Sequence, residues 1–204
     1  MKIKILNITK LLGCLNSIGH VLPYPSDGFI AAYIHADPVR VVVTPQAALV
    51  TDPDELALED DEATALVADL QAEVFAAEGA RLEVLEPGSW VLELPETPRL
   101  RTVPREAAIG AEASAGLPGG PERARWHRLV NEAQMVLAAH PVNHRRRRAG
   151  RPEVTSLWLW GSGPRPGGGR APWPGAGGKA PGLLGLARWS GVPFELVAGK
   201  AMSS

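Results

Sequence analysis

Short apolar stretches with strand-like patterns occur in two pairs along the first half of the chain. Residues 39–44 and 47–51 are rich in valine and alanine, and Pro45 between them predicts a hairpin with a rigid turn. Residues 81–86 and 90–94 are joined by a proline and a glycine and predict a second hairpin. Each hairpin is short, so both need another element to cover their apolar faces.

Two longer segments carry the three-to-four-residue apolar repeat of an amphipathic helix. In residues 60–78 the first turn is acidic, which suits the positive end of a helix, and Gly79 is a natural stop. In residues 122–139 the apolar stripe follows Pro121, which fits a first helical turn. We expect both helices to pack on a sheet.

The stretch from His140 to Gly163 is the most informative part of the chain. Pro141 lacks an N–H and disfavours helical geometry at His140, so the helix is predicted to end there and a turn rich in arginine to follow. Residues 154–160 are apolar on both alternating faces, which predicts a strand covered on both sides. A glycine elbow, residues 161–163, is expected to end the strand and to bring its backbone N–H groups near the basic turn, a typical arrangement for binding anions.

These elements predict an α+β fold, with helices packed on a mostly antiparallel sheet. The expected organisation is an atypical amino-terminal segment over residues 1–35 and an α+β domain over residues 36–163. A disordered linker rich in glycine and proline is expected over residues 164–182, and a short helix and strand over residues 183–204.

Composition narrows the classes of function. The chain has 204 residues, is 45% hydrophobic and has a formal net charge of −1, so it can bury a core but lacks the overall positive charge of a general nucleic-acid-binding protein. Its single cysteine, Cys14, excludes an internal disulfide. No apolar run reaches the ~18 to 20 residues of a membrane span. We expect a cytoplasmic protein, and the alternative is an exported lipoprotein modified at Cys14.

Each candidate site also has a structural interpretation. His140 and His144 have a spacing that suits two metal ligands on one helical face, but Pro141 interrupts that face, so a metal site is not expected. The arginine run 145–148 is a solvated turn, a phosphate clamp or a nucleic-acid patch. The tryptophans of residues 154–160 are expected in the core, and the glycines after them could simply end the strand.

A family resemblance rests on motifs in fixed order. The sequence His140-Pro-Val-Asn143, followed by Arg146, Gly150 and Pro152 and then by residues 156–163, resembles the signature of archaeal-type cofactor-independent phosphoglycerate mutases. It is still more similar to their bacterial relatives, the regulatory proteins of the RpfE type. Residues 185–193 resemble a helix that follows in those proteins, and a weaker match begins at residues 36–39. The resemblance covers most of the chain from residue 36 to residue 197.

The resemblance implies a binding site for a small phosphorylated acid. Arg146 would be the fork for phosphate or carboxylate, His140 and Asn143 would be hydrogen-bonding partners, and the N–H groups around Gly161 and Gly163 would complete the pocket. The family also implies a phosphorylated serine or threonine and two divalent metals such as manganese. We recognise no such nucleophile and no metal ligands in this sequence, so we expect no catalytic residue, no metal and no cofactor here.

Two departures weaken the expected polar contacts, because Thr155 and Leu184 stand where the family usually has asparagine and arginine. The expected function is therefore that of a truncated or diverged, catalytically incomplete phosphoglycerate mutase-like protein with a possible pocket for a phosphorylated acid. The alternative is a non-enzymatic regulatory or interaction module whose basic turn contacts a protein or nucleic acid. Of these partners nucleic acid is not favoured, and the sequence identifies no protein partner.

Overall fold

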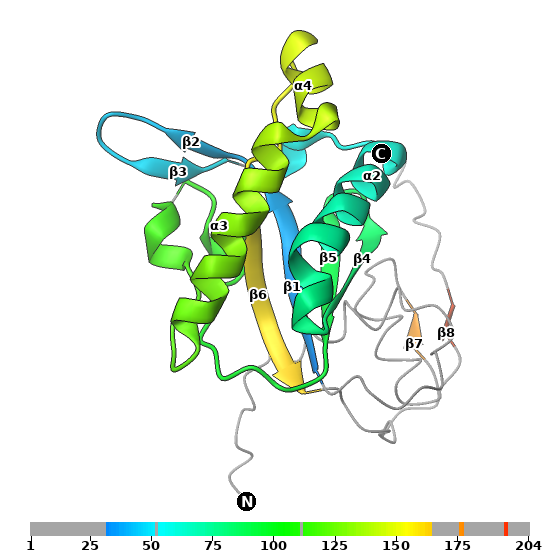
Figure 1. Ribbon diagram of the computed structural model, residues 1–204, viewed down its shortest axis with the longest axis vertical. Helices are drawn as coiled ribbons and strands as arrows, with labels where there is room; N and C mark the ends of the chain where they lie inside the picture. Colours follow the sequence, from blue (N-terminus) through cyan, green and yellow to red (C-terminus); the bar gives the residue numbers. More distant parts are fainter. Residues whose placement is uncertain (1–31, 52, 111, 165–175, 178–193, 196–204) are drawn as a thin grey trace, which may run out of the picture.

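Four antiparallel strands form the central sheet of the computed structural model, in the order β4-β5-β1-β6 (Figure 1). The structure describes residues 32–51, 53–110, 112–164, 176–177 and 194–195. The strands are β1 (Ala32–Val39), β2 (Val41–Val43), β3 (Ala48–Val50), β4 (Arg81–Glu86), β5 (Ser89–Leu94), β6 (Ser156–Pro164), β7 (Ala176–Gly177) and β8 (Phe194–Glu195). The helices are η1 (Pro53–Leu56), α2 (Asp60–Leu70), η2 (Gln71–Phe75), η3 (Ala76–Glu78), η4 (Arg105–Ala107), η5 (Ala113–Gly116), α3 (Arg123–Ala139) and α4 (Pro141–Arg148).

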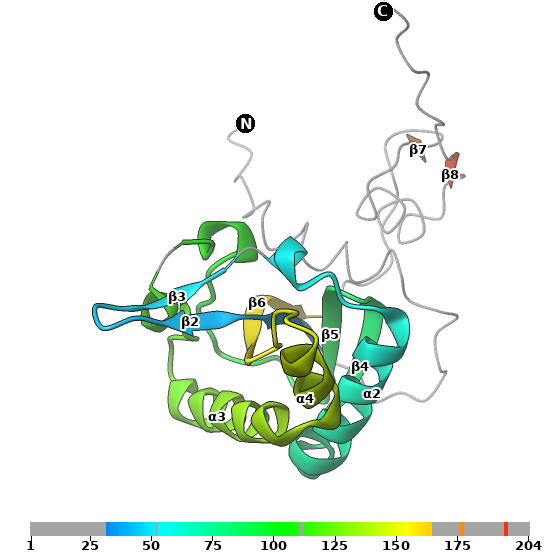
Figure 2. The same ribbon diagram turned by 90° about the horizontal axis from the view of Figure 1, so that it is seen from above.

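Helices α2 and α3 lie side by side on one face of the sheet (Figures 1 and 2). The sheet contributes alternate residues to the core beneath them, and each helix contributes the apolar stripe that its sequence predicts. The largest fully buried side chains of this core include Ile34, Leu66, Trp90, Trp126 and Leu137. Burying one large apolar side chain stabilises the folded state by about 1.5–3 kcal/mol, and the sum of these contributions holds the two layers together.

The other face of the sheet is buried as well. Trp158 and Trp160 of β6 form a second cluster with Val39, Val50 and Ala108, so β6 is covered on both sides as its sequence predicts. The indole N–H of Trp158 donates to the carbonyl of Val103 at 3.0 Å. The segment that follows β5 is thereby attached to this face of the sheet.

The predicted α+β class is confirmed, with a mostly antiparallel sheet and helices packed on it. The helix expected over residues 60–78 is present as α2 continued by η2 and η3, and Gly79 ends it with a left-handed φ of 66°. Helix α3 and the two hairpins, β2–β3 and β4–β5, also lie where the sequence predicts them.

Three expectations about local structure differ from what the structure shows. The residues after Pro141 form helix α4, not a turn. Strand β6 continues through the expected glycine elbow to Pro164. Strand β1 begins at Ala32, inside the segment assigned to the amino-terminal part.

Strand β7 falls within the expected linker. It pairs in parallel with β8, which lies where the sequence predicts a strand near residue 194. The rest of the expected linker and carboxy-terminal segment, and residues 1–31 with the lipoprotein alternative at Cys14, lie outside the described residues. Among the helices described, none combines the length and the apolar character needed to cross a membrane.

Candidate functional site

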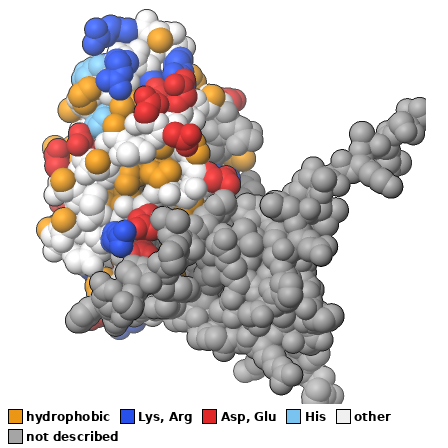
Figure 3. All heavy atoms as spheres, turned by 90° about the vertical axis from the view of Figure 1, so that its right-hand side faces the viewer, with side chains coloured by type: hydrophobic (Ala, Val, Ile, Leu, Met, Phe, Trp, Pro, Cys, Tyr) orange, Lys and Arg blue, Asp and Glu red, His pale blue; other side chains and the backbone are white. Residues whose placement is uncertain are grey.

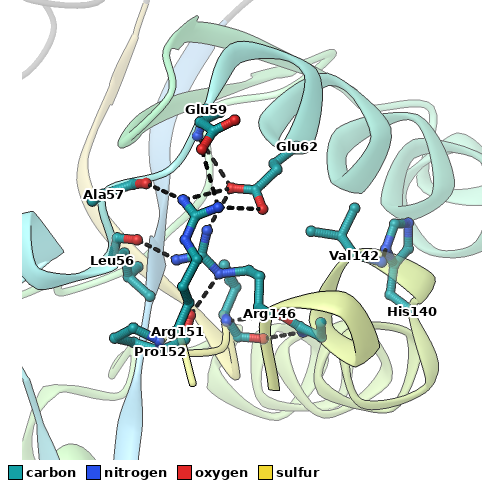
Figure 4. Close-up of polar contacts among 11 residues, drawn as sticks. Leu56, Ala57, Glu59, Glu62, His140, Val142, Arg146, Arg151 and Pro152 are labelled. Carbon is teal, nitrogen blue, oxygen red and sulfur yellow. Dashed lines mark hydrogen bonds and ion pairs between the residues drawn. The ribbon is translucent and has the colours of Figure 1, made fainter. Parts of the chain in front are cut away.

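Helix α4 begins at Pro141, and the side chain of His140, the residue before it, caps the helix. The Nδ1 atom of His140 accepts a hydrogen bond from the backbone N–H of Val142 at 3.1 Å, and Pro141 occupies the first helical position. Because Nδ1 is an acceptor, the neutral imidazole carries its proton on Nε2, which lies 3.0 Å from the Asp69 carboxylate of α2. Both ring nitrogens of His140 therefore contact protein atoms, the residue is 6% exposed, and Figure 4 shows its contact with Val142.

Asn143 joins α4 to the chain that enters β6. Its amide nitrogen donates to the carbonyls of Leu137 at 2.8 Å and Val154 at 2.6 Å, while its amide oxygen accepts from the N–H of Val154 at 2.9 Å. The side chain is buried, and three of its hydrogen-bonding positions are filled.

Arg146 is the most enclosed charged residue of this region, with a side chain that is 0% exposed. Its guanidinium donates to the carboxylate of Glu62, to the carbonyl of Leu56 and, at 2.6 Å, to the carbonyl of Pro152 (Figure 4). Arg151 reaches the same Glu62 carboxylate at 3.3 Å. Arg146 therefore connects α4 to the start of α2, to the end of η1 and to the segment before β6.

The remaining arginines of α4, Arg145, Arg147 and Arg148, are exposed. Arg147 donates to Glu153 at 2.9 Å, and this hydrogen bond holds the pKa of the Glu153 carboxyl below its usual value. Arg145 has no ion pair with any described residue. In Figure 3 the basic side chains gather at the end of the molecule where α4 lies, close to a group of acidic side chains.

Gly161 and Gly163 lie toward the far end of β6 from α4, because Val154, the contact of Asn143, precedes the strand and the two glycines come near its close. Gly161 has a φ of 67° at a register shift in the pairing of β6 with β1. Between the pairs Tyr33–Gly163 and His35–Trp160, one residue of β1 opposes two of β6, the pattern of a β-bulge. The structure thus brings His140, Asn143 and Arg146 together without these glycines, and substrate binding by the five residues stays a prediction.

The structure also contains a buried polar cluster on β1 that the sequence analysis does not predict. Asp37 is fully buried, and its carboxylate accepts hydrogen bonds from the backbone N–H of Trp90 at 3.0 Å and the indole of Trp160 at 2.7 Å. Arg105 lies 3.4 Å from the same carboxylate, and His35 stacks on Trp160 with ring centroids 4.2 Å apart. The available signal was the Asp-Pro pair of residues 37–38, inside the weaker motif match.

The cluster fixes the second face of the sheet, since one carboxylate joins β1, β5, β6 and the segment around η4. Within the described part of the chain, no three histidine, cysteine, aspartate or glutamate side chains are placed to share a metal ion.

The chain is 40% identical over 68 residues to "2,3-bisphosphoglycerate-independent phosphoglycerate mutase 2" of Methanothermobacter thermautotrophicus, which is 33% of this chain and 17% of the relative. It is 36% identical over 63 residues to the 2,3-bisphosphoglycerate-independent phosphoglycerate mutase of Methanosarcina barkeri, which is 31% of this chain and 16% of the relative. The chain is similar to cofactor-independent phosphoglycerate mutases. The matched segments span about a sixth of the length of these relatives.

The fold is also that of part of a solved enzyme of this kind. The cofactor-independent phosphoglycerate mutase from Thermoplasma acidophilum superimposes with a TM-score of 0.54 at 15% identity, over 97% of this chain and 58% of that chain. No protein-family model matches the chain. The closer resemblance to RpfE-type regulatory proteins stays a prediction.

Proposed function

We propose that this is a phosphoglycerate mutase-like protein whose described domain binds a small phosphorylated acid and does not catalyse its isomerisation. The observation that carries the proposal is the identity of 36–40% with phosphoglycerate mutases over 63–68 residues. The described residues form no metal-ligand set, so the proposal assigns no metal-dependent step to them. Two-metal phosphoryl transfer needs both ions fixed about 3.5 to 4 Å apart.

The contacts of α4 suggest how such a ligand would be held. His140, Asn143 and Arg146 are directed to protein atoms, and their contacts fix α4 in place. The side chains that α4 presents to solvent include Arg145 and Arg148. We therefore assign the contact with the ligand's phosphate or carboxylate to these exposed guanidiniums, and a positioning role to the three buried residues.

Calorimetric titration with 3-phosphoglycerate tests this assignment. The double variant Arg145→Ala/Arg148→Ala is expected to lose binding while its thermal unfolding stays close to that of the unaltered chain, since both side chains are exposed. Arg146→Ala is expected to lower the unfolding temperature, and any loss of binding should accompany that loss of stability. No heat with either 2- or 3-phosphoglycerate would contradict the proposal.

A coupled mutase assay with manganese, magnesium or cobalt added tests the second half of the proposal. We expect no turnover above a mock-purified control. Turnover that persists in a preparation free of host mutase would contradict catalytic incompleteness.

The alternative is a regulatory or interaction module, favoured by the exposure of the same arginines on α4, which lies at one end of the described domain (Figure 1). A patch that binds nucleic acid by charge alone would lose affinity about equally with each exposed arginine and would show a steep salt dependence. Titration of the Arg145→Ala and Arg148→Ala single variants with a short oligonucleotide distinguishes this alternative from a phosphorylated-acid site.

A further inference from the structure

A groove of about 530 Å³ runs between the wall formed by α2 and η2 and the wall formed by α3. Asp69 and Glu73 line the first wall, and Glu132, Met135 and Val136 line the second. The first wall includes η2, whose wider π-type turn is a local irregularity of a kind that is frequent at functional sites. The groove is distinct from the exposed arginine face of α4.

The charges along this groove have one sign. No lysine or arginine lines it, and its carboxylates come from both walls. Asp69 is satisfied by His140 and Glu132 lies 3.4 Å from Arg128, but Glu73 is exposed and has no ion pair with any described residue. The groove therefore favours a cationic partner, and it disfavours the phosphorylated acid proposed for α4.

The α3 wall also presents apolar surface. Met135 is 73% exposed, one of few large hydrophobic side chains in the described residues with such exposure, and Val136 beside it is half-buried. Together with Glu132 and Ala139 these residues recur at i, i+3, i+4 and i+7, the spacing at which one helix contacts another.

We propose that this groove is a docking site for a basic amphipathic helix of another protein. Apolar side chains of that helix would cover Met135 and Val136, and its lysine or arginine side chains would pair with Glu73 on one wall and Glu132 on the other. The helix α4 of a second copy fits less well, because its exposed face carries His144 and arginines but no large apolar side chain. The inference does not depend on the phosphoglycerate mutase proposal.

Three labelled synthetic peptides of about 16 residues, long enough to form a helix on a surface, test the site with the full chain. The first carries leucine at helical spacing flanked by lysine, the second replaces lysine with glutamate, and the third replaces leucine with alanine. Fluorescence anisotropy at low salt should show binding of the first peptide at least about tenfold tighter than of either control.

Matched variants locate the binding on the groove. Glu73→Lys should weaken binding of the leucine-lysine peptide about tenfold, and Met135→Ala should weaken it about threefold. Glu112→Lys makes the same change of charge at an exposed position beside β3, away from the groove, and should change affinity less than about twofold. Circular dichroism should show all three variants folded, since the three side chains are exposed.

Several results would overturn the proposal. Equal losses of affinity for Glu73→Lys and Glu112→Lys would mean that only the net charge of the chain matters. Equal binding of the leucine and alanine peptides would mean that no apolar contact contributes to binding. Sedimentation of the chain alone is expected to show a monomer. A dimer that Glu73→Lys dissociates would mean that a second copy, not a partner helix, fills the groove.

Discussion

Replacing Arg146 with alanine is expected to lower the free energy of unfolding by about 3 kcal/mol, near the lower end of the range for breaking a buried ion pair. The substitution leaves Glu62, whose side chain is 8% exposed, without its most buried partner, and it leaves the carbonyls of Leu56 and Pro152 without this donor. The value lies at the lower end because Arg151 still reaches Glu62 at 3.3 Å.

Urea unfolding followed by tryptophan fluorescence measures this loss, since Trp90 and Trp126 lie in the core that α2 and α3 cover. Arg147→Ala is the matched control: it removes the neighbouring arginine of the same helix, whose partner Glu153 lies at the surface, and its effect should be far smaller. A loss below about 1 kcal/mol for Arg146→Ala, or equal losses for the two variants, would refute the reasoning that Arg146 is a structural tie.

Two further predictions concern packing and charge. Gly116→Ala should destabilise the fold by about 1–3 kcal/mol because the new Cβ would overlap the ring of Trp158, whereas Gly119→Ala, with no neighbouring atom nearer than 3.8 Å, should cost much less in thermal unfolding. A hydrogen bond from Arg125 lowers the pKa of Glu78 from 4.5, so the pair stabilises the fold above about pH 4.5 and loses that contribution as the pH falls through the lowered value. Glu78→Gln should therefore lower the unfolding temperature at about pH 7, and this difference from the unaltered chain should shrink as the pH falls below about 4.5.

Local periodicity accounts for the elements that the sequence predicts correctly. In α2 and α3 the buried face is apolar and the exposed face polar, so the repeat of three to four residues is visible without knowledge of the fold. The two hairpins are visible for a similar reason, because turn residues separate short apolar runs.

Helix α4 was missed because its buried face is mainly polar. Val142, Asn143 and Arg146 are its buried residues, so the apolar repeat that would indicate a helix is absent, and the arginines suggested a solvated turn. The available signal was the His140-Pro141 pair, which was interpreted as the end of one helix. The same pair also supplies a side-chain cap and a proline at the first helical position of the next helix.

The expectation that Gly161 ends β6 is wrong for a related reason. Glycine ends many strands, but Gly161 permits a left-handed backbone at a bulge, and the strand continues beyond it. Whether a strand ends at such a glycine or continues through a bulge depends here on pairing with β1. This pairing joins residues more than 100 positions apart, so no local sequence pattern predicts it.

The contacts of the motif residues change how the similarity to phosphoglycerate mutases bears on function. His140 caps α4, Asn143 forms hydrogen bonds with the end of α3 and with the residue Val154 before β6, and Arg146 pairs with Glu62 of α2. Contacts within the protein are therefore enough to explain all three residue types. In this chain the motif residues fix α4 in place, and the motif does not by itself identify a ligand contact. Ligand binding is therefore best tested with variants of the exposed arginines of α4, because these substitutions can change binding without changing stability.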